Sequence, residues 1–510
     1  MVSRAPAAAT AALCALLLVS AIAGQEVTLD DDARTGQKKT RDEDVSRDAF
    51  ELAASKGYEV EEHPRVTTRD GYILKMIRIV GSPKRNSAEQ GPCPGTWENP
   101  PVLLQHGLID SAATWVMNMP KQSLGFVLAD QGYDVWLGNN RGNSYSMEHE
   151  RLQGNSNGRD EGFWDFSWDE MAEYDLPAEI DYVLKTTGAQ TLSYISHSQG
   201  TAQGFAAFSE NPELARKVGV HVALAPVAFV GSTDSALFQV ASYLPFLKEV
   251  ATLPAVQSLG NTLLGTGVGA NIVKSLVPGI CNVFLGGCDS EKNPRDPHNE
   301  LFDSGLMGNL FSLPDMTHLN QTRIPVYLSH LPEGTSVRNL LHWAQSVRTN
   351  KFQKYDFGPA ENQQRYGQED PPEYDLLAYS VPTLLIYGSK DPIANRKDVR
   401  RLARVFQQTG VLLGTMEIPT YDHNDFTLAA DGFEFFFEYV LDRVEGAACA
   451  AEGGEGAGEE GAGEEEADAQ DWRGVLQTGA GSFWTFLSEE LSSVEEQELQ
   501  DLVLEEGSLP

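Results

Sequence analysis

The stretch Leu192-Ser193-Tyr194-Ile195-Ser196-His197-Ser198-Gln199-Gly200 decides the predicted fold. Its first four residues predict a buried strand, and Thr201–Ser209 predicts a helix. A serine on a tight turn between strand and helix has its hydroxyl pushed clear of the backbone, and the flanking positions must be small because the two elements lie close together. Gly200 and Ser196 meet that need. We therefore predict that Ser198 is a nucleophile; the alternative is a helix start that the serine merely caps.

On both sides of this stretch, short apolar runs alternate with helical segments. Strands alternating with helices favour a parallel sheet that is covered on both faces, and hence the α/β class. A hairpin around Asp70-Gly71 is predicted ahead of this series, within His63–Val80. The predicted further strands are Val102–Gln105, Tyr133–Leu137, Val220–Leu224, Thr383–Tyr387 and Thr415–Ile418, and the predicted further helices are Trp168–Lys185, which Ser167 and Glu170 open as a capping box, and Asp398–Gln408.

A serine hydroxyl needs a base that takes its proton and an acid that orients this base. On a scaffold with the serine at such a turn, these residues follow in the order serine, acid, histidine. His423 comes just after the last predicted strand, and Asp391 just after the strand before it. Asp398 competes as the acid, but it opens a predicted helix, where an acid favours the helix dipole. We predict Asp391 and His423, the alternative for His423 being a histidine on a surface loop.

The negative oxygen that develops during acyl transfer needs backbone N–H donors. One donor is expected from the residue after the nucleophile, Gln199. The second is expected from His106-Gly107-Leu108, which follows the strand Val102–Gln105, because Gly107 allows close backbone approach. The N–H of Leu108 is the candidate; the alternative is an ordinary turn at the end of a strand.

The predicted sheet is interrupted by residues 229–382, which are too many for a simple connection. We therefore predict a core formed by residues 53–228 and 383–445, with a mobile, mostly helical cap or lid inserted between them. Val250–Val273 carries no charge, which leaves a membrane span as an alternative, although it is rich in Gly, Thr and Asn.

Both ends of the chain differ from this core in composition. Met1–Ala23 has a short apolar run and a small-residue cleavage site, which predicts a signal peptide; an N-terminal membrane anchor is the alternative. Residues 24–52 are predicted to be a disordered leader. Residues 446–510 form an acidic, low-complexity tail with a candidate amphipathic helix, or a tail that contacts nothing.

Charge and cysteine content narrow the classes of partner. The net charge of −35 argues against binding to nucleic acid and to anionic membranes, and leaves a neutral lipid surface open. The sequence has no cluster of cysteine and histidine residues that would indicate a metal site, and no cofactor is predicted. Cys281 and Cys288 form a candidate disulfide or remain free thiols, and Asn320-Gln321-Thr322 is a candidate glycosylation site.

From about residue 58 to 440 the chain resembles the acid lipase family, the group of gastric and lysosomal acid lipases. The resemblance implies an α/β-hydrolase fold with a cap and lid, and activity on triacylglycerols or sterol esters. It implies that Ser198 is the nucleophile, Asp391 the acid and His423 the base. It also implies that Leu108 and Gln199 provide the oxyanion donors. The stretches that carry it, besides the one around Ser198, are His63–Leu74, Leu104–Leu108, Trp136–Asn143, Phe163–Met171, Tyr327–His330, Gly334–Val337 and Leu341–Trp343.

The chain departs from the family pattern at three places. Ser196 replaces a glycine, the cysteine that family members place before the Cys281 equivalent is absent, and the acidic tail is additional. We predict a secreted, or lysosomal or vacuolar, serine esterase of neutral lipids that acts at an oil–water interface. The alternatives are a non-catalytic lipid-binding protein on the same scaffold and a hydrolase of another acyl bond.

Overall fold

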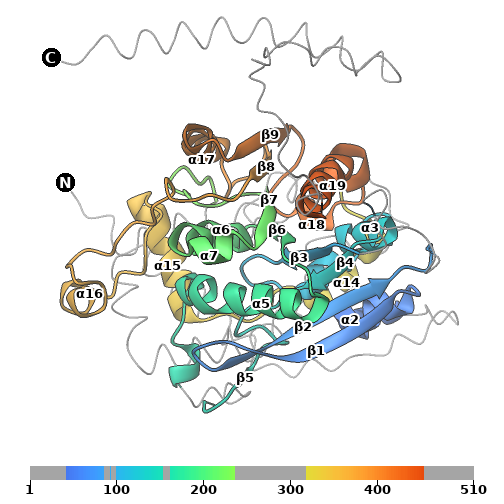
Figure 1. Cartoon of the computed structure of the whole chain (residues 1–510), viewed down its shortest axis with the longest axis horizontal. Helices are drawn as coiled ribbons and strands as arrows, with labels where there is room; N and C mark the ends of the chain where they lie inside the picture. Colours follow the sequence, from blue (N-terminus) through green and yellow to red (C-terminus); the bar gives the residue numbers. More distant parts are fainter. Residues whose placement is uncertain (1–41, 86–91, 93–98, 153–160, 236–316, 453–510) are drawn as a thin grey trace, which may run out of the picture. The chain divides into compact units, whose positions relative to one another are not determined.

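The computed structural model describes residues 42–85, 92, 99–152, 161–235 and 317–452, all of which belong to the unit Met1–Glu455 (Figure 1). The predicted signal peptide, most of the predicted leader, Val250–Val273, both Cys281 and Cys288, and the tail beyond Glu452 lie outside these residues.

A nine-stranded sheet forms the centre, with the strand order β1-β2-β4-β3-β6-β7-β8-β9, and β5 pairs with β2. The pairs from β4 through β9 are parallel, whereas β1, β2 and β5 join in antiparallel pairs. The predicted mostly parallel sheet is thus confirmed. The strands are β1 (Glu59–Thr67), β2 (Tyr72–Gly81), β3 (Pro101–Gln105), β4 (Asp134–Leu137), β5 (Glu148–His149), β6 (Leu192–His197), β7 (Val218–Leu224), β8 (Thr383–Gly388) and β9 (Leu412–Ile418).

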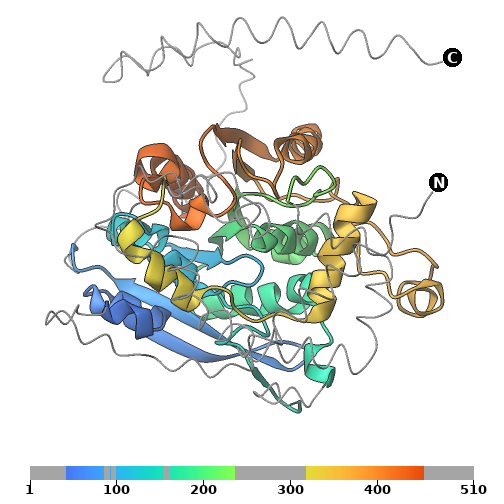
Figure 2. The ribbon, with the colours of Figure 1, turned by 180° about the vertical axis from the view of Figure 1, so that it is seen from behind.

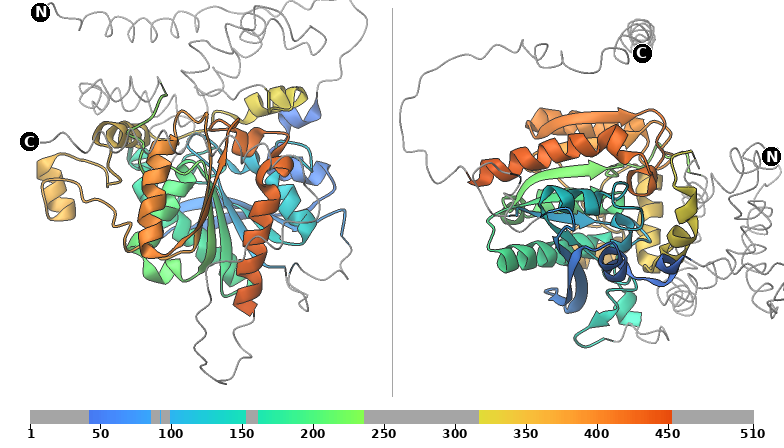
Figure 3. Two further views of the ribbon diagram at one scale, coloured as in Figure 1. Left: turned by 90° about the horizontal axis from the view of Figure 1, so that it is seen from above. Right: turned by 90° about the vertical axis from the view of Figure 1, so that its right-hand side faces the viewer.

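Helices cover both faces of this sheet. In Figure 3, left, the strands run between α6 and α17 on one side and α3 and α19 on the other. The helices before β8 are η1 (Glu43–Ser46), α2 (Ala49–Ser55), η2 (Ala112–Trp115), α3 (Leu124–Gln131), η3 (Glu161–Trp164), α4 (Trp168–Glu170), η4 (Met171–Asp175), α5 (Leu176–Thr187), α6 (Gln199–Glu210), α7 (Pro212–Ala215), η5 (Gln321–Arg323), α14 (Ile324–His330), α15 (Val337–Thr349) and α16 (Pro359–Tyr366). Those after β8 are α17 (Arg396–Thr409), α18 (Asp425–Leu428), η6 (Phe433–Phe437) and α19 (Glu438–Glu452).

The central strands are buried along their whole length, because both faces are covered. Every residue of β3, β4, β6 and β8 is buried. Their apolar side chains, such as Leu104, Ile195 and Leu385, are fully removed from solvent. Burial of one such side chain stabilises the fold by about 1.5–3 kcal/mol, so these strands form a rigid base for the loops at their carboxyl ends.

The predicted boundary of the disordered leader at residue 52 is wrong. Residues 43–46 form η1 and residues 49–55 form α2. Asp48 caps α2 in a capping box with Glu51, and Leu52 is buried in the core. This helix is too short for its apolar residues to show a helical repeat in the sequence. Short helices are unstable alone, so α2 is ordered because it packs on the core.

The described part of the chain between β7 and β8 comprises residues 225–235 and 317–382, and helices occur in the second of these ranges. Residues 317–382 contain η5, α14, α15 and α16. Figure 2, the view from behind, shows α14 and α15 on the same side of the sheet. Among the described residues, no helix has the length and apolar character needed to traverse a bilayer.

Candidate active site

The turn between β6 and α6 is sharply bent at Ser198. This residue has φ 51° and ψ −120°, a backbone conformation that residues other than glycine rarely adopt and that costs about 1–3 kcal/mol. A Cβ atom on Gly200 would lie 2.8 Å from the carbonyl oxygen of Gln105 and 2.9 Å from that of His106. Only a glycine therefore lets α6 approach β3 this closely, as the sequence pattern predicted.

The structure brings Ser198, His423 and Asp391 into one hydrogen-bonded line. Nε2 of His423 lies 2.7 Å from the Ser198 hydroxyl oxygen, and Nδ1 of His423 lies 2.8 Å from Oδ2 of Asp391. All three residues are buried, with Ser198 exposed by 8%. A neutral imidazole that donates from Nδ1 to a carboxylate presents a lone pair at Nε2, which is the arrangement needed to accept a hydroxyl proton.

The carboxylate of Asp391 is held by its own loop. The backbone N–H groups of Ile393 and Ala394 each donate to its Oδ1 at 2.8 Å. Nδ1 of His423 lies 2.8 Å from Oδ2 and 3.1 Å from Oδ1. The competing Asp398, at the start of α17, instead accepts hydrogen bonds from the backbone and hydroxyl of Ser232. Asp391, and not Asp398, is therefore the carboxylate that contacts the imidazole.

The loop after β3 lies against the nucleophile turn. A Cβ atom on Gly107 would lie 3.1 Å from the Cβ of Ser198. Nδ1 of His106 lies 2.8 Å from the carbonyl oxygen of Gly107, and Nε2 of His106 accepts from the N–H of Asn140 at 3.1 Å. Burial lowers the pKa of His106 to about 4, which keeps the imidazole neutral. Because C=O and N–H of one trans peptide point in opposite directions, the N–H of Leu108 points away from His106.

The N–H of Gln199 begins α6. The first N–H groups of a helix have no acceptor within the helix, so this group is available to a ligand. The two predicted oxyanion donors, on Leu108 and Gln199, thus belong to two backbone segments that both adjoin Ser198.

Sequence reasoning missed four hydrogen bonds around this turn. Nε2 of His197 lies 2.7 Å from the backbone carbonyl oxygen of His423 and donates to it. The hydroxyl of Ser196 lies 2.7 Å from Nε2 of His221 on the neighbouring strand β7. The side-chain oxygen of Gln199 accepts from two side chains of α15. Each contact joins segments far apart in the chain, and no local pattern encodes it.

Asn320, the candidate glycosylation residue, is the other predicted site that falls within the described residues. Asn320 caps η5, its amide donates to Gln122 at 3.0 Å, and the hydroxyl of Thr322 donates to its side-chain oxygen at 2.7 Å. Within the described ranges, no group of three His, Cys, Asp or Glu side chains is arranged to hold a metal ion.

Comparisons with known proteins identify the class of this chain. Residues 50–119 match the family model described as a partial alpha/beta-hydrolase lipase region, and residues 100–260 match the model of the alpha/beta hydrolase fold. The fold and these matches define an α/β hydrolase.

Curated relatives identify the family within this class. The chain is 40% identical to gastric triacylglycerol lipase of Homo sapiens over 402 residues, which cover 79% of this chain and 92% of the relative. It is 38% identical to lipase member K of Mus musculus, over 80% of this chain and 94% of the relative. It is 37% identical to lysosomal acid lipase/cholesteryl ester hydrolase of Homo sapiens, over 79% of this chain and 92% of the relative. The chain belongs to the α/β-hydrolase lipase family of the gastric and lysosomal acid lipases.

Proposed function

We propose that this chain is a serine esterase that hydrolyses neutral lipid esters, namely triacylglycerols or sterol esters. The observation that carries the proposal is the line from the Ser198 hydroxyl through His423 to Asp391, with distances of 2.7 and 2.8 Å. The names of the relatives, triacylglycerol lipase and cholesteryl ester hydrolase, support this substrate class.

In the first half of the reaction, the hydroxyl oxygen of Ser198 attacks the ester carbonyl carbon while Nε2 of His423 takes the hydroxyl proton. Asp391 holds the imidazole in the required tautomer and stabilises its positive charge. The resulting tetrahedral carbon carries a negative oxygen. When the C–O bond to the alcohol breaks, His423 returns its proton to the leaving oxygen, and the acyl group stays on Ser198.

The N–H groups of Leu108 and Gln199 would stabilise the negative oxygen. Removal of one such donor typically costs about 2.7–4 kcal/mol of transition-state stabilisation. In the second half of the reaction, His423 takes a proton from water, the hydroxide attacks the acyl carbon, and the proton then passes to Ser198 as the fatty acid leaves.

Two exposed apolar side chains on the segment between β3 and α3 suit contact with a lipid phase. Ile109 follows Leu108 directly and is exposed by 39%, and Met119, four residues after Trp115 of η2, is exposed by 42%. Isolated exposed apolar side chains are common, but these two lie on the segment that also carries a proposed oxyanion donor. We propose that the ester enters from this side.

The proposed compartment is the secretory route, ending outside the cell or in the lumen of a lysosome or vacuole. The predicted signal peptide Met1–Ala23 supports this route, as does Cys449 in α19, which takes part in a disulfide. Disulfides persist in oxidising compartments. The half-buried Asn320 is the proposed glycosylation site, at which a glycan would replace the hydrogen bond to Gln122. A disulfide between Cys281 and Cys288 stays a prediction.

The test is hydrolysis of emulsified triolein and cholesteryl oleate by the secreted protein and by Ser198→Ala, each shown to be folded by circular dichroism. We expect turnover of at least one ester by the parent and none by the variant. Ester binding without turnover by the parent would favour the non-catalytic lipid-binding alternative. Turnover of a thioester or amide alone would favour a hydrolase of another acyl bond, and equal rates for parent and variant would refute Ser198 as the nucleophile.

A further inference from the structure

The side chain of Gln199 is turned toward the inserted helix α15. Its Oε1 accepts a hydrogen bond from Nδ2 of Asn339 at 2.8 Å and a second from Nε1 of Trp343, also at 2.8 Å. Its Nε2 contacts the sulfur of Met171 at 3.4 Å. All of these side chains are buried, with Gln199 exposed by 2% and Asn339 by 0%. Both donors lie one helical turn apart on the same face of α15, so they converge on one oxygen.

Helix α15 is itself fixed to the first residue of α4 and to the segment just before it. Oδ1 of Asn339 accepts from the backbone N–H of Trp168 at 2.9 Å, so this amide bridges Trp168 and Gln199. The imidazole of His342 stacks on the ring of Trp168, with centroids 4.2 Å apart and an angle of 11° between planes. The hydroxyl of Ser336, which caps α15, donates to the carbonyl of Phe166. The two donors therefore stand on a rigid support.

The backbone N–H of Gln199 is attached next to the same Cα atom as its side chain, so a side chain that is anchored at its far end limits the movement of this part of the backbone. Two hydrogen bonds to one buried carbonyl oxygen restrict the side-chain torsions of Gln199, and with them the position of its Cα at the first residue of α6. The N–H of this residue is one of the two proposed oxyanion donors. A displacement of a catalytic group by about 1 Å can lower a rate by about 10²-fold.

We propose that Asn339 and Trp343 are positioning residues, which hold Gln199 so that its backbone N–H is directed at the developing oxyanion. The inserted segment between β7 and β8 thereby supports the reaction centre in addition to any role as a cover. This inference rests on the proposed esterase function and adds residues that the Ser198, His423 and Asp391 line does not include.

A positioning role predicts an effect on kcat that exceeds any effect on KM. The oxyanion forms only in the transition state, so that a misdirected donor weakens transition-state binding and leaves ground-state binding of the ester unchanged. Loss of a whole donor lowers kcat by about 10²–10³-fold. We therefore expect a loss of about 10- to 100-fold for a donor that is displaced and not removed.

Trp343→Phe is the central variant, because phenylalanine keeps an aromatic ring against Trp168 and lacks the N–H. Asn339→Asp is the second variant, because it keeps the oxygen that accepts from Trp168 and loses the amide donor to Gln199. Gln199→Glu and Gln199→Met form a pair of similar size, of which only the first keeps the accepting oxygen. Trp136→Phe is the matched control: this tryptophan is also fully buried, but its indole N–H has no hydrogen-bond partner among the described residues.

The measurements are kcat and KM on p-nitrophenyl butyrate, the inhibition constant of butylboronic acid, and the melting temperature. A boronic acid forms a tetrahedral adduct with a serine and so reports on the oxyanion donors without turnover. We expect Trp343→Phe and Asn339→Asp to lower kcat about 10- to 100-fold and to weaken the boronate in parallel, with KM within about threefold. Gln199→Met should lose more activity than Gln199→Glu, and Trp136→Phe should keep the parent kcat.

The proposal is overturned if both α15 variants keep kcat within twofold of the parent, or if they change only KM or only the melting temperature. If the parent itself hydrolyses no ester in this assay, the proposed function fails. An active parent with equally active variants refutes only the positioning role. If an α15 variant does not fold, the Gln199→Glu and Gln199→Met pair takes its place. This pair tests the same two hydrogen bonds by keeping or removing the oxygen that accepts them.

Discussion

Nε2 of His423 lies 2.7 Å from the hydroxyl oxygen of Ser198, although 225 positions separate the two residues in the chain. The sheet order explains this distance. Strands β6, β7, β8 and β9 are consecutive neighbours and parallel, so the loops after β6, β8 and β9 open at one edge. Ser198, Asp391 and His423 each lie in one of these loops, and a shared edge is sufficient to bring them together.

The first prediction distinguishes the two candidate acids. Asp391→Asn keeps the shape of the side chain but presents an amide to His423, which favours the wrong imidazole tautomer, and we expect kcat to fall about 10³–10⁴-fold. Asp398→Asn, whose parent residue contacts Ser232, should keep kcat within about twofold. Ester hydrolysis by the two purified variants provides the measurement. A larger loss in Asp398→Asn than in Asp391→Asn would contradict the assignment.

The second prediction concerns Ser196, which replaces a glycine of the family pattern. Its hydroxyl bonds to Nε2 of His221, whose Nδ1 lies 2.9 Å from the hydroxyl of Tyr379. Burial lowers the pKa of His221 to about 3, so the ring is neutral and needs one acceptor and one donor. Ser196→Ala leaves Nε2 buried without this partner, and we expect the free energy of unfolding to fall by about 1–3 kcal/mol.

Denaturant unfolding of Ser196→Ala and of Ser193→Ala, a change at a buried serine on the same strand, measures this effect. The kcat of Ser196→Ala should stay close to that of the parent, because its hydroxyl points toward β7 and not toward Ser198. Equal stability of the two variants would show that the contact with His221 contributes nothing.

The order of the chemical groups along the chain was predictable from sequence because each belongs to a local pattern. The nucleophile turn needs a strand, a small residue, a serine and a glycine within a few positions, and all of these are written in one stretch around Ser198. Asp391 and His423 follow predicted strands directly. The parallel sheet was predictable for the same reason, since its central strands are short apolar runs between helical segments.

The supports of the site were not predictable, because they depend on docking between distant segments. Gln199 and Trp343 are separated by 144 positions, and Asp44 and Arg323 by 279. Asp44 lies in a polar segment that the sequence indicated to be disordered, and only its partners in the folded chain explain its burial. A local sequence pattern contains no information on such pairs.

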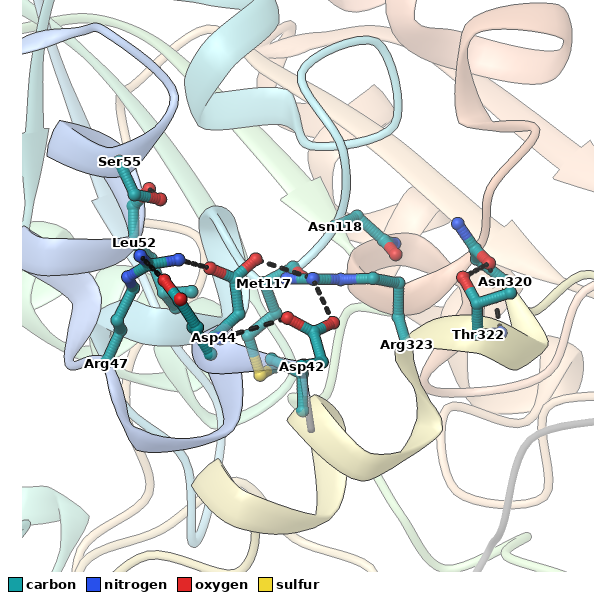
Figure 4. A network of polar contacts seen from close by, with 12 residues as sticks. Asp42, Asp44, Arg47, Leu52, Ser55, Met117, Asn118, Asn320, Thr322 and Arg323 are labelled. Atoms are coloured by element: carbon teal, nitrogen blue, oxygen red, sulfur yellow. Dashed lines mark hydrogen bonds and ion pairs between the residues drawn. The ribbon is translucent and has the colours of Figure 1, made fainter. Parts of the chain in front are cut away.

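The third prediction concerns this N-terminal ion cluster, which Figure 4 shows between η1 and η5. Asp44 accepts from Arg47, Lys56 and Arg323, and Arg323 also donates to the carbonyl of Met117. Burial alone would raise the pKa of Asp44, but its three cationic partners hold this pKa well below its usual range. At pH 7 we expect Asp44→Asn to lower the free energy of unfolding by about 1–3 kcal/mol, because the buried Arg323 loses one of its two carboxylate partners and the partly buried Arg47 and Lys56 lose a charged acceptor.

Equilibrium unfolding at pH 7 checks this value, with Asp181→Asn as the control. Asp181 forms an exposed ion pair with Lys217, and loss of such a pair should give no measurable change. If Asp44→Asn unfolded at the same denaturant concentration as the parent, the negative charge of Asp44 would contribute no stability and the prediction would be contradicted.

The fourth prediction concerns Asp110, in the loop after the oxyanion segment. Burial raises its pKa to about 7, although the backbone N–H of Ser111 donates to its Oδ1 at 2.7 Å. A carboxyl whose pKa is higher in the folded than in the unfolded chain stabilises the fold at low pH. This stability is lost as pH rises from about 4 to 7, at up to about 1.4 kcal/mol per pH unit.

Asp110→Asn removes this titration and keeps the oxygen that accepts from Ser111. We expect the stability of the variant relative to the parent to increase between pH 4.5 and 7.5, as measured by denaturant unfolding. The difference between variant and parent is compared because buried histidines with lowered pKa, such as His197 and His342, make both proteins more stable as pH rises. This shared effect cancels in the difference. Asp370→Asn, at an exposed aspartate, is the control, and a difference independent of pH would contradict the prediction.

The most direct test of the central claim is mass spectrometry of the folded protein after exposure to a fluorophosphonate, which phosphonylates only an activated serine. The account predicts one adduct per chain, on the peptide that contains Ser198, and a much slower reaction in His423→Ala. An adduct on another serine, or an unmodified Ser198 in a folded and otherwise reactive protein, would contradict it.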